Sequence, residues 1–240
     1  MKNNLLSLQN VSLQFNSKDK KILSHINLDI SPKDFCVLLG SNGSGKSSLL
    51  KVIEGRYSIS SGKLMFNHKL LSDYSSIELS SNIKSLTQNT HESLFTSLSL
   101  FENYLIFSHQ KNNKKSLLDY QHYISPFNVR LGAKANELVS NLSGGEKQSL
   151  ALGLLFINPP KLLLLDEHTS ALDPKSAHRI MELTKTMVVK NNITCIMTTH
   201  DLDEARLYAT DIVALKEGKI HHQFKNRADL STKELLESCF

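Results

Sequence analysis

The sequence has no apolar stretch long enough to cross a lipid bilayer. Its longest such run extends only from Leu150 to Ile157, whereas a membrane-spanning helix needs about 20 apolar residues. The first residues also lack the apolar stretch and the small-residue cleavage site of a secretory signal. We therefore expect a protein that does not span the membrane and that stays in the cytoplasm.

Cysteines are few, and basic residues form no stripe. Cys36, Cys195 and Cys239 are far apart, which argues against a disulfide framework or a zinc site. The first two lie within apolar runs and are expected to be buried thiols. The net charge is +5, and without a basic stripe interleaved with aromatic residues we expect no nucleic-acid partner. Hydrophobic residues make up 40% of the chain, so its composition is not that of a disordered protein.

Continuous apolar runs alternate with helix-like segments along most of the chain. The runs at 35–39, 161–165 and 193–198 are typical of buried strands in a parallel sheet that is covered on both faces. The segments between residues 6 and 15 alternate apolar and polar residues, which favours half-exposed antiparallel strands. Residues 89–141 have few strand signals. The pattern predicts a helical insertion within an α/β core.

A phosphate-binding loop is the strongest chemical signal. Residues 40–47, Gly-Ser-Asn-Gly-Ser-Gly-Lys-Ser, match G-x-x-x-x-G-K-[ST] between an expected strand and an expected helix that runs to Glu54. The glycines let the backbone wrap around phosphates, and the helix N-terminus adds partial positive charge. Lys46 can reach the β- and γ-phosphates, and the Ser47 hydroxyl can ligate Mg²⁺. The alternative is a glycine-rich turn with an incidental lysine, which the strand–loop–helix context disfavours.

Two adjacent carboxylates follow another expected strand. Asp166 and Glu167 come directly after the apolar run 162–165, where they are costly unless a cation or a reaction uses them. Ligands of open parallel sheets bind at the carboxyl ends of the strands. Asp166 would then hold Mg²⁺, and Glu167 would polarise a water that attacks the γ-phosphate. Without the phosphate loop, a solvated loop would be the better interpretation.

A second anion site is indicated at Ser143-Gly144-Gly145. The serine is a good N-cap at the start of an apolar periodic run, and the glycines leave backbone N–H groups accessible. A helix cap without further function is the alternative. If both sites contact one nucleotide, the second site would come from another copy of the domain.

These motifs, in this order and over nearly the whole chain, resemble those of the ATP-binding subunits of ABC transporters. The resemblance implies an α/β fold of the P-loop NTPase, ABC ATPase type, with a central mainly parallel sheet, an antiparallel β subdomain and a helical subdomain. It implies a single domain over residues 1–240. We expect its core at 1–88 and 161–240, and the helical subdomain with the signature motif at 89–160.

The resemblance also assigns roles to single residues. Phe15 would stack on adenine, although tyrosine is commoner there, and Gln88 would contact Mg²⁺ and signal to the membrane partner. His200 would be the switch histidine near the γ-phosphate, and Asp173 would lie in the loop that crosses a dimer interface. Taken alone, Phe15 could simply pack, His200 could be an ordinary strand-end histidine, and Asp173 could be an N-cap before Pro174.

Three groups of site residues follow from the resemblance. The catalytic group is Glu167, His200 and Gln88, and the metal ligands are Ser47, Gln88 and Asp166. The ATP-binding residues are Phe15, Gly40, Ser41, Asn42, Gly43, Ser44, Gly45, Lys46, Ser47, Ser48, Ser143, Gly144, Gly145 and Asp173. Ser143, Gly144 and Gly145 match the family signature, which binds the γ-phosphate of ATP held by the opposite subunit.

Two departures from the family pattern stand out. Glu167 is followed by His168 where the family usually has proline, and residues 146–150 lack an arginine that many relatives carry. The stretch 158–175 is similar to a branch of importer ATPases linked to tryptophan or tyrosine uptake. Members of that branch pair with a separate permease and a lipid-anchored binding protein.

The resemblance therefore implies an ATPase that powers a membrane transporter, with ATP and Mg²⁺ as cofactors. The expected process is binding-protein-dependent import of a small solute such as an amino acid. The expected partners are an integral-membrane permease, an extracytoplasmic substrate-binding protein reached through that permease, and a second ATPase subunit in an ATP-dependent homodimer at the cytoplasmic face of the membrane. Two alternatives stay open. One is a soluble single-cassette ABC ATPase that acts in assembly, and the other is a regulator that does not hydrolyse ATP, against which Glu167 and His200 argue.

Overall fold

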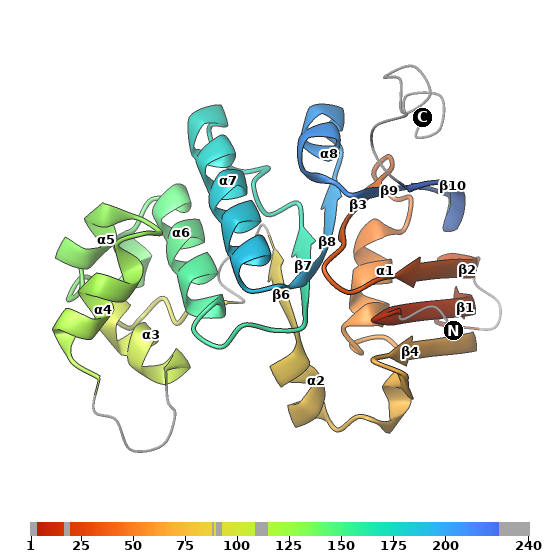
Figure 1. Ribbon diagram of the computed structural model, residues 1–240, viewed down its shortest axis with the longest axis horizontal. Coiled ribbons are helices and arrows are strands. Elements are labelled where there is room, and N and C mark those ends of the chain that lie inside the picture. The colour runs from red at the N-terminus through yellow and green to blue at the C-terminus, as the bar shows by residue number, and fades with distance from the viewer. Residues whose placement is uncertain (1–3, 17–19, 88, 90–92, 109–114, 226–240) are drawn as a thin grey trace. The chain divides into compact units, whose positions relative to one another are not determined.

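The computed structural model describes residues 4–16, 20–87, 89, 93–108 and 115–225 (Figure 1). The strands are β1 (Leu6–Leu13), β2 (Leu23–Ile30), β3 (Phe35–Leu39), β4 (Ser61–Phe66), β5 (Lys69–Leu70), β6 (Ile83–Thr87), β7 (Leu162–Asp166), β8 (Thr194–Thr199), β9 (Asp211–Lys216) and β10 (Lys219–Lys225). The α-helices are α1 (Lys46–Ile53), α2 (Ser76–Asn82), α3 (Leu100–Phe107), α4 (Leu117–Ile124), α5 (Val129–Ala133), α6 (Gly144–Leu155), α7 (Pro174–Lys190) and α8 (Leu202–Tyr208). Short 3-10 helices lie at Leu71–Asp73 and Val139–Asn141.

The strands form two sheets. One has six strands in the order β10-β9-β3-β8-β7-β6, in which β9, β3, β8 and β7 pair in parallel and β10 pairs antiparallel to β9. The other has four antiparallel strands in the order β2-β1-β4-β5. The predicted α/β fold, with a mainly parallel central sheet and an antiparallel β part, is confirmed.

Apolar runs and their polar ends explain where the predicted strands begin and end. Every residue of β3 and of β8 is buried, and β3 has the predicted bounds. β7 and β8 each lie one residue later than predicted, because Asp166 and Thr199 continue the parallel pairing beyond the apolar runs. The alternating segment was expected to reach Phe15, but β1 ends at Leu13, and Phe15 follows the strand as an exposed residue.

By the contacts within each part, the chain divides into two compact units. The first comprises the described residues of Met1–Ser85, Lys161–Asp166 and Asn192–Phe240. The second comprises those of Leu86–Pro160 and Glu167–Asn191. Helix α7 lies in the second unit, whereas the predicted boundaries place all of 161–240 with the core.

The hydrophobic core of the first unit is formed by side chains of the four-stranded sheet, of α1 and of one face of the central sheet. Alternate residues of the central strands, such as Leu38 of β3 and Leu164 of β7, enter the same cluster as Ile53 of α1 and Val11 of β1. Side chains of a strand point alternately to opposite faces, so a continuous apolar strand supplies a core on both sides. Cys36 and Cys195 are buried free thiols, as predicted.

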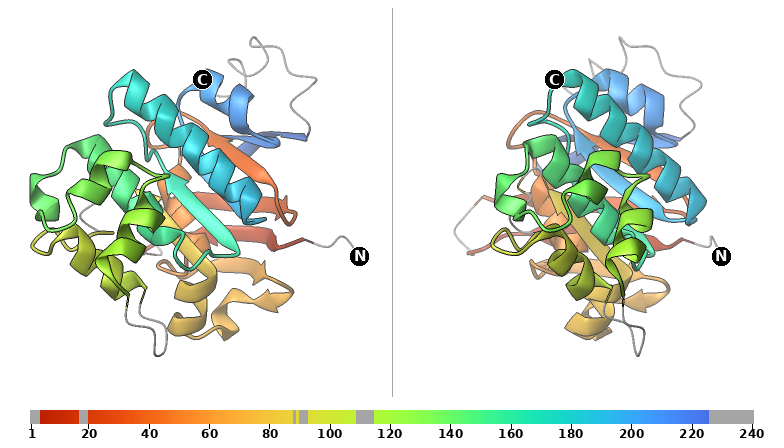
Figure 2. Two further views of the ribbon diagram at one scale, coloured as in Figure 1. Left: turned by 60° about the vertical axis from the view of Figure 1, so that its left-hand side comes forward. Right: turned by 90° about the vertical axis from the view of Figure 1, so that its left-hand side faces the viewer.

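The second unit is helical and contains α3 to α7 (Figure 2), and aromatic side chains form a cluster within it. Tyr104 contacts the rings of Phe101, Tyr120 and Tyr123, and the ring contacts continue from Tyr123 to Phe127. Aromatic pairs of this kind add to the stability that burial of the rings provides. Three of these helices begin with a serine capping box, at Ser99, Ser116 and Ser143.

A turn at Gly218 connects three parts of the first unit. Its N–H donates to the Ser44 carbonyl oxygen at 2.9 Å, and its own carbonyl accepts from the N–H of Ser24 at 2.7 Å. Gly218 has φ +73°, and a Cβ there would overlap the carbonyl oxygen of Ile22. Glycine is therefore required where the β9–β10 turn meets the chain just before β2 and the loop before α1.

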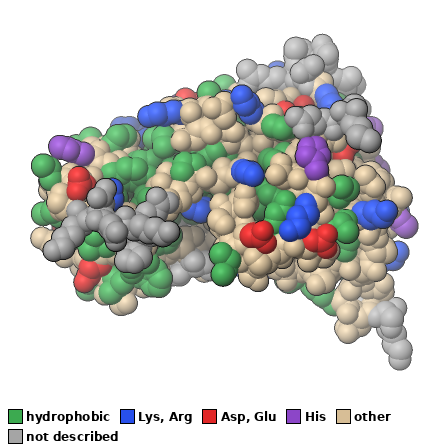
Figure 3. Space-filling view, turned by 60° about the horizontal axis from the view of Figure 1, so that its bottom comes forward, with side chains coloured by type: hydrophobic (Ala, Val, Ile, Leu, Met, Phe, Trp, Pro, Cys, Tyr) green, Lys and Arg blue, Asp and Glu red, His purple; other side chains and the backbone are tan. Residues whose placement is uncertain are grey.

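Two features of the described residues bear on membranes and on surface charge. Among the helices of the described residues, none combines the length and the apolar character that crossing a bilayer needs. On the face that Figure 3 shows, the described lysine and arginine side chains are scattered among acidic and uncharged ones.

Candidate functional site

The loop between β3 and α1 has a conformation that glycine allows. Gly40 has φ +156° and Gly45 has φ +106°, which side chains with a Cβ rarely adopt. A Cβ at Gly40 would overlap the carbonyl oxygen of Leu215, so this position accepts only glycine without a shift of β9. At Gly43, by contrast, a Cβ would meet nothing within 4 Å. The backbone of the loop thus follows the predicted strand–loop–helix path.

Polar groups of this loop are directed inward. The Lys46 ammonium donates to the carbonyl oxygens of Gly40 at 2.7 Å and Ser41 at 3.2 Å, and Lys46 is buried. Ser44 Oγ is buried and has no hydrogen-bond partner among the described residues. A buried cation beside an unpaired hydroxyl fits an anionic ligand, because an unsatisfied buried polar group otherwise costs free energy.

The carboxyl ends of three parallel strands meet beside this loop. Asp166 pairs with Thr198 across β7 and β8, and Leu39 pairs with Thr199 across β3 and β8. One Asp166 carboxylate oxygen, Oδ1, accepts from Ser47 Oγ at 3.1 Å and from Thr198 Oγ1 at 2.7 Å. The structure therefore brings together two of the predicted metal ligands, Ser47 and Asp166, whose oxygen atoms are of the kind that Mg²⁺ prefers.

Phe15 lies on the surface of the first unit. Its side chain is 58% exposed, and its ring meets that of Tyr57 edge to face, with centroids 5.1 Å apart. The backbone before it is fixed, since Gln14 N–H donates to Ser60 Oγ at 2.8 Å and Ser60 Oγ donates back to the Gln14 carbonyl at 3.0 Å. An exposed aromatic ring that is held by Tyr57 on one side is better suited to stack on a planar ligand than to fill a core.

His200 is exposed and follows β8 directly. The next residue, Asp201, is the N-cap of α8 and accepts from the N–H groups of Asp203 and Glu204. Thr199 Oγ1 donates to Glu204 at 2.8 Å. His200 thus lies on a short, fixed connection at the same sheet edge as Asp166.

In the second unit, Ser143 begins α6 as predicted. Its hydroxyl accepts from Glu146 N–H, and the Glu146 carboxylate accepts from Ser143 N and Oγ, which completes a capping box. Gly144 and Gly145 are the first two residues of the helix, where backbone N–H groups have no partner within the helix. An anion at this end would be stabilised by these donors.

Glu167 adopts a left-handed backbone conformation. Its φ is +47°, which is uncommon for a residue with a side chain and is found disproportionately at functional sites. Its carbonyl accepts from the N–H and the Oγ of Ser170 at 3.1 and 2.9 Å. These two hydrogen bonds fix the turn that carries the predicted catalytic carboxylate.

The neighbouring His168 is buried, with 2% of its surface exposed. Neither of its ring nitrogens has a hydrogen-bond partner among the described residues. Burial lowers the pKa of His168 to about 4, because a charged imidazolium would lose its hydration. His168 is therefore neutral at physiological pH.

Asp173 is the N-cap of α7, as the sequence predicted from the proline that follows. Its carboxylate accepts from Ser176 N–H at 3.1 Å. Hydrogen bonds from Ser176 hold the pKa of Asp173 below its usual range. The alternative assignment as a helix cap is thus confirmed, and it is compatible with the predicted interface role.

The remaining predicted residues and some unpredicted ones complete the description. Gln88 lies outside the described residues. The exposed tip of the loop before α1 is formed by Ser41, Asn42 and Gly43, and Ser48 lies in the first turn of α1. Sequence reasoning missed Thr198, because only the register of β7 against β8 places its hydroxyl on Asp166. It also missed Tyr57, whose ring contacts the site residue Phe15, and Lys134, which contacts Glu146 just after the Ser143-Gly144-Gly145 motif.

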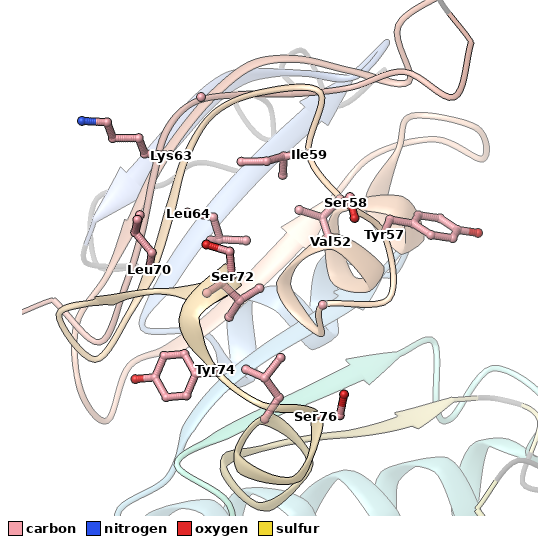
Figure 4. Close-up of a pocket in the computed structure, with 14 residues that line it drawn as sticks. Val52, Tyr57, Ser58, Ile59, Lys63, Leu64, Leu70, Ser72, Tyr74 and Ser76 are labelled. Atoms are coloured by element: carbon pink, nitrogen blue, oxygen red, sulfur yellow. The ribbon is translucent and has the colours of Figure 1, made fainter.

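A separate pocket of about 540 Å³ lies in the first unit (Figure 4). Apolar side chains and serine hydroxyls line it, among them Val52, Leu64, Ser72 and Tyr74. None of the predicted site residues lines this pocket. The pocket is therefore not the place where the loop between β3 and α1 would hold an anion.

Comparisons with known proteins give a consistent result. The family model described as "ABC transporter" matches residues 23–170. A tyrosine transport ATP-binding protein of Clostridioides difficile is 31% identical over 97% of this chain and 98% of its own length. The spermidine/putrescine import ATP-binding protein PotA of Spiroplasma citri is 34% identical over 92% of this chain. The chain spans 61% of the length of that second relative.

Two solved structures have the same fold. One is cbiO1 from Clostridium perfringens, part of the ABC transporter complex cbiONQ, with a TM-score of 0.83 and 27% identity over 98% of this chain and 94% of that one. The other is the ATP-binding cassette MJ0796 as a dimer in a post-hydrolysis state, bound to ADP and Pi. It has a TM-score of 0.77 and 26% identity over 92% of this chain and 98% of that one.

Proposed function

Since this chain belongs to the family of ABC transporter ATP-binding proteins and is an ATPase, we propose that it powers the import of a small solute, such as an amino acid, through a separate membrane permease. The observation that carries this proposal is the match to the tyrosine transport ATP-binding protein, which extends over nearly the full length of both chains. The import direction draws support from the PotA relative, whose name specifies import.

In the proposed cycle, the first unit binds the nucleotide. Phe15 stacks on the adenine, and Lys46 moves its hydrogen bonds from the Gly40 and Ser41 carbonyls to the phosphates. Ser47 and Asp166 would hold Mg²⁺, which would neutralise phosphate charge. Ser44 Oγ, buried without a partner among the described residues, gains a phosphate oxygen as acceptor.

Catalysis then depends on carboxylate and imidazole groups. Glu167 orients and polarises the attacking water, and the hydrogen bond from Ser170 to its carbonyl fixes the backbone of the turn that carries it. His200, at the carboxyl end of β8, contacts the γ-phosphate. Gln88, which we count as a Mg²⁺ ligand, carries the signal toward the permease.

Two copies of the chain form the active assembly, as in the dimer of the related cassette MJ0796. Ser143, Gly144 and Gly145 of one copy bind the γ-phosphate that the other copy holds, and Asp173 lies at their interface. Loss of the γ-phosphate on hydrolysis removes these contacts, and the dimer opens. A ligand shifts such an equilibrium only through contacts that differ between the two states, and the γ-phosphate supplies that difference.

The partners in this proposal are a permease at the cytoplasmic face of the membrane and, through it, an extracytoplasmic substrate-binding protein. The related cbiO1 is likewise part of a transporter complex. The test is a detergent pull-down of tagged Glu167→Gln protein from native membranes with Mg-ATP, followed by identification of the bound proteins. Wild-type protein with ADP serves as the control.

The pull-down separates transport from assembly. A multispanning membrane protein that is retained with Mg-ATP supports the proposal. Uptake of candidate solutes can then be measured in vesicles reconstituted with that protein. Recovery of soluble assembly factors alone would overturn the transport function and leave the ATPase activity intact.

A further inference from the structure

A carboxylate lies beside the residues that we propose bind the γ-phosphate. Glu146, the third residue of α6, accepts hydrogen bonds from Ser143 N and Oγ through its Oε2 at 3.0 and 3.1 Å. This capping box stabilises the start of the helix. It also fixes a negative charge at a helix end that would otherwise attract anions.

Lys134 contacts that carboxylate. Its Nζ is 2.9 Å from Glu146 Oε1, and the Glu146 side chain is only 13% exposed. The second carboxylate near Lys134, that of Glu137, is farther away, at 3.9 Å, and 48% exposed. Each oxygen of Glu146 therefore has its own donor, with Lys134 on Oε1 and Ser143 on Oε2.

The electrostatics of the pair agree with this geometry. The hydrogen bond to Glu146 raises the pKa of Lys134. Burial raises the pKa of Glu146, but the hydrogen bonds from Lys134 and Ser143 outweigh it and hold that pKa below its usual range. Both side chains are thus charged at neutral pH, and together they present no net charge to an approaching phosphate.

We propose that Lys134 is a positioning residue that neutralises Glu146, so that the N-terminal end of α6 can bind the γ-phosphate of ATP on the opposite subunit. The inference rests on the proposed function, because that γ-phosphate is the anion concerned. Lys134 acts through Glu146 and need not touch the nucleotide. Without Lys134, the Glu146 charge repels the γ-phosphate across a partly solvated interface and weakens the ATP-bound dimer by roughly tenfold.

The test is a double-mutant cycle in the Glu167→Gln background. The variants are Lys134→Gln, Glu146→Gln and the two combined, and glutamine at 146 retains the capping box. The matched control is Lys190→Gln, which removes an exposed lysine at the end of α7 in the same unit. The dimer dissociation constant with Mg-ATP is measured by sedimentation, and thermal unfolding verifies that every variant is folded.

The expected order of the dimer dissociation constants follows from charge alone. Lys134→Gln raises the dimer dissociation constant by roughly tenfold, the double variant returns it close to the parent value, and Lys190→Gln leaves it unchanged. The Lys134→Gln effect also shrinks as the NaCl concentration rises, because salt screens the repulsion.

Two results would overturn the inference in distinguishable ways. If the parent dimerises with Mg-ATP but the double variant is as weak as Lys134→Gln, Lys134 has a structural role only. If the parent itself does not dimerise with Mg-ATP, the proposed contact between subunits fails and the inference fails with it.

Discussion

Thr198 donates a 2.7 Å hydrogen bond to the same Asp166 oxygen that accepts from Ser47. The three side chains come from β8, β7 and α1, and parallel pairing of β7 with β8 sets Asp166 opposite Thr198. The Asp166 carboxylate is therefore oriented before any cation binds. Hydrogen bonds that orient a ligating side chain commonly raise the affinity of the site for its metal ion.

Replacement of Thr198 by valine should weaken Mg²⁺ binding. Valine has nearly the same shape but no hydroxyl, so Asp166 loses one of its two donors. We expect the Mg²⁺ concentration for half-maximal ATPase activity to rise by about tenfold. Thr194→Val is the matched control, since Thr194 lies at the other end of β8 and accepts from Lys33 N–H. An equal rise in both variants would contradict the assigned role of Thr198.

Replacement of Glu167 by glutamine should stop turnover without loss of ATP binding. The amide keeps the size of the side chain but cannot polarise the attacking water, so we expect kcat to fall by about 10²–10⁴-fold. Phosphate release measures turnover, and equilibrium dialysis measures ATP affinity. Glu182→Gln, on the exposed side of α7, is the control. Equal phosphate release from the Glu167 variant and the wild type would refute the catalytic role.

Replacement of Phe15 by alanine should weaken binding of ATP but not of inorganic tripolyphosphate. Stacking of a base on an aromatic side chain accounts for about 1–3 kcal/mol, which corresponds to roughly 5- to 150-fold in affinity. Phe15→Tyr should retain the affinity. Phe95→Ala, which removes another half-exposed ring, is the control. A comparable loss of tripolyphosphate affinity would show that Phe15 serves the fold of the loop and not the base.

The buried His168 predicts that stability falls in mild acid. Its pKa is about 4 in the folded protein and about 6.5 when unfolded, so between these values the unfolded chain binds a proton that the folded chain does not. The free energy of unfolding then falls by up to about 1.4 kcal/mol for each pH unit below 6.5, and this loss ends near pH 4. Urea titrations between pH 7.5 and 5 measure it.

A matched pair of variants isolates this contribution. His168→Leu should flatten the pH dependence of the free energy of unfolding, because leucine does not titrate. His178→Leu, which removes an exposed histidine of α7, is the matched control. An identical pH dependence in the wild type and the His168 variant would exclude a neutral buried imidazole.

The sequence was sufficient to predict what local patterns encode. The phosphate loop, the strand at 35–39, the N-caps at Ser143 and Asp173 and the helical character after residue 89 all follow from apolar runs, glycine spacing and cap residues. Buried parallel strands are visible as continuous apolar runs because both faces are covered.

Long-range partners could not be predicted in this way. Thr198 and Asp166 are 32 residues apart, and only strand register brings their side chains together. Lys134 matches no motif, and only its contact with Glu146 in the structure indicates a role for it. The end of β1 at Leu13 was also missed, since alternation continues to Phe15 although the last pairing residue of that strand is Leu13.

The Gly218 turn has a consequence for local unfolding. Its N–H donates to Ser44 and its carbonyl accepts from Ser24, so the phosphate loop, the chain entering β2 and the β9–β10 hairpin should open as one cooperative unit. The amide protons of Ser24 and Gly218 should then exchange with solvent deuterium at one common rate. Bound nucleotide should slow amide exchange as far along the chain as the edge strand β10.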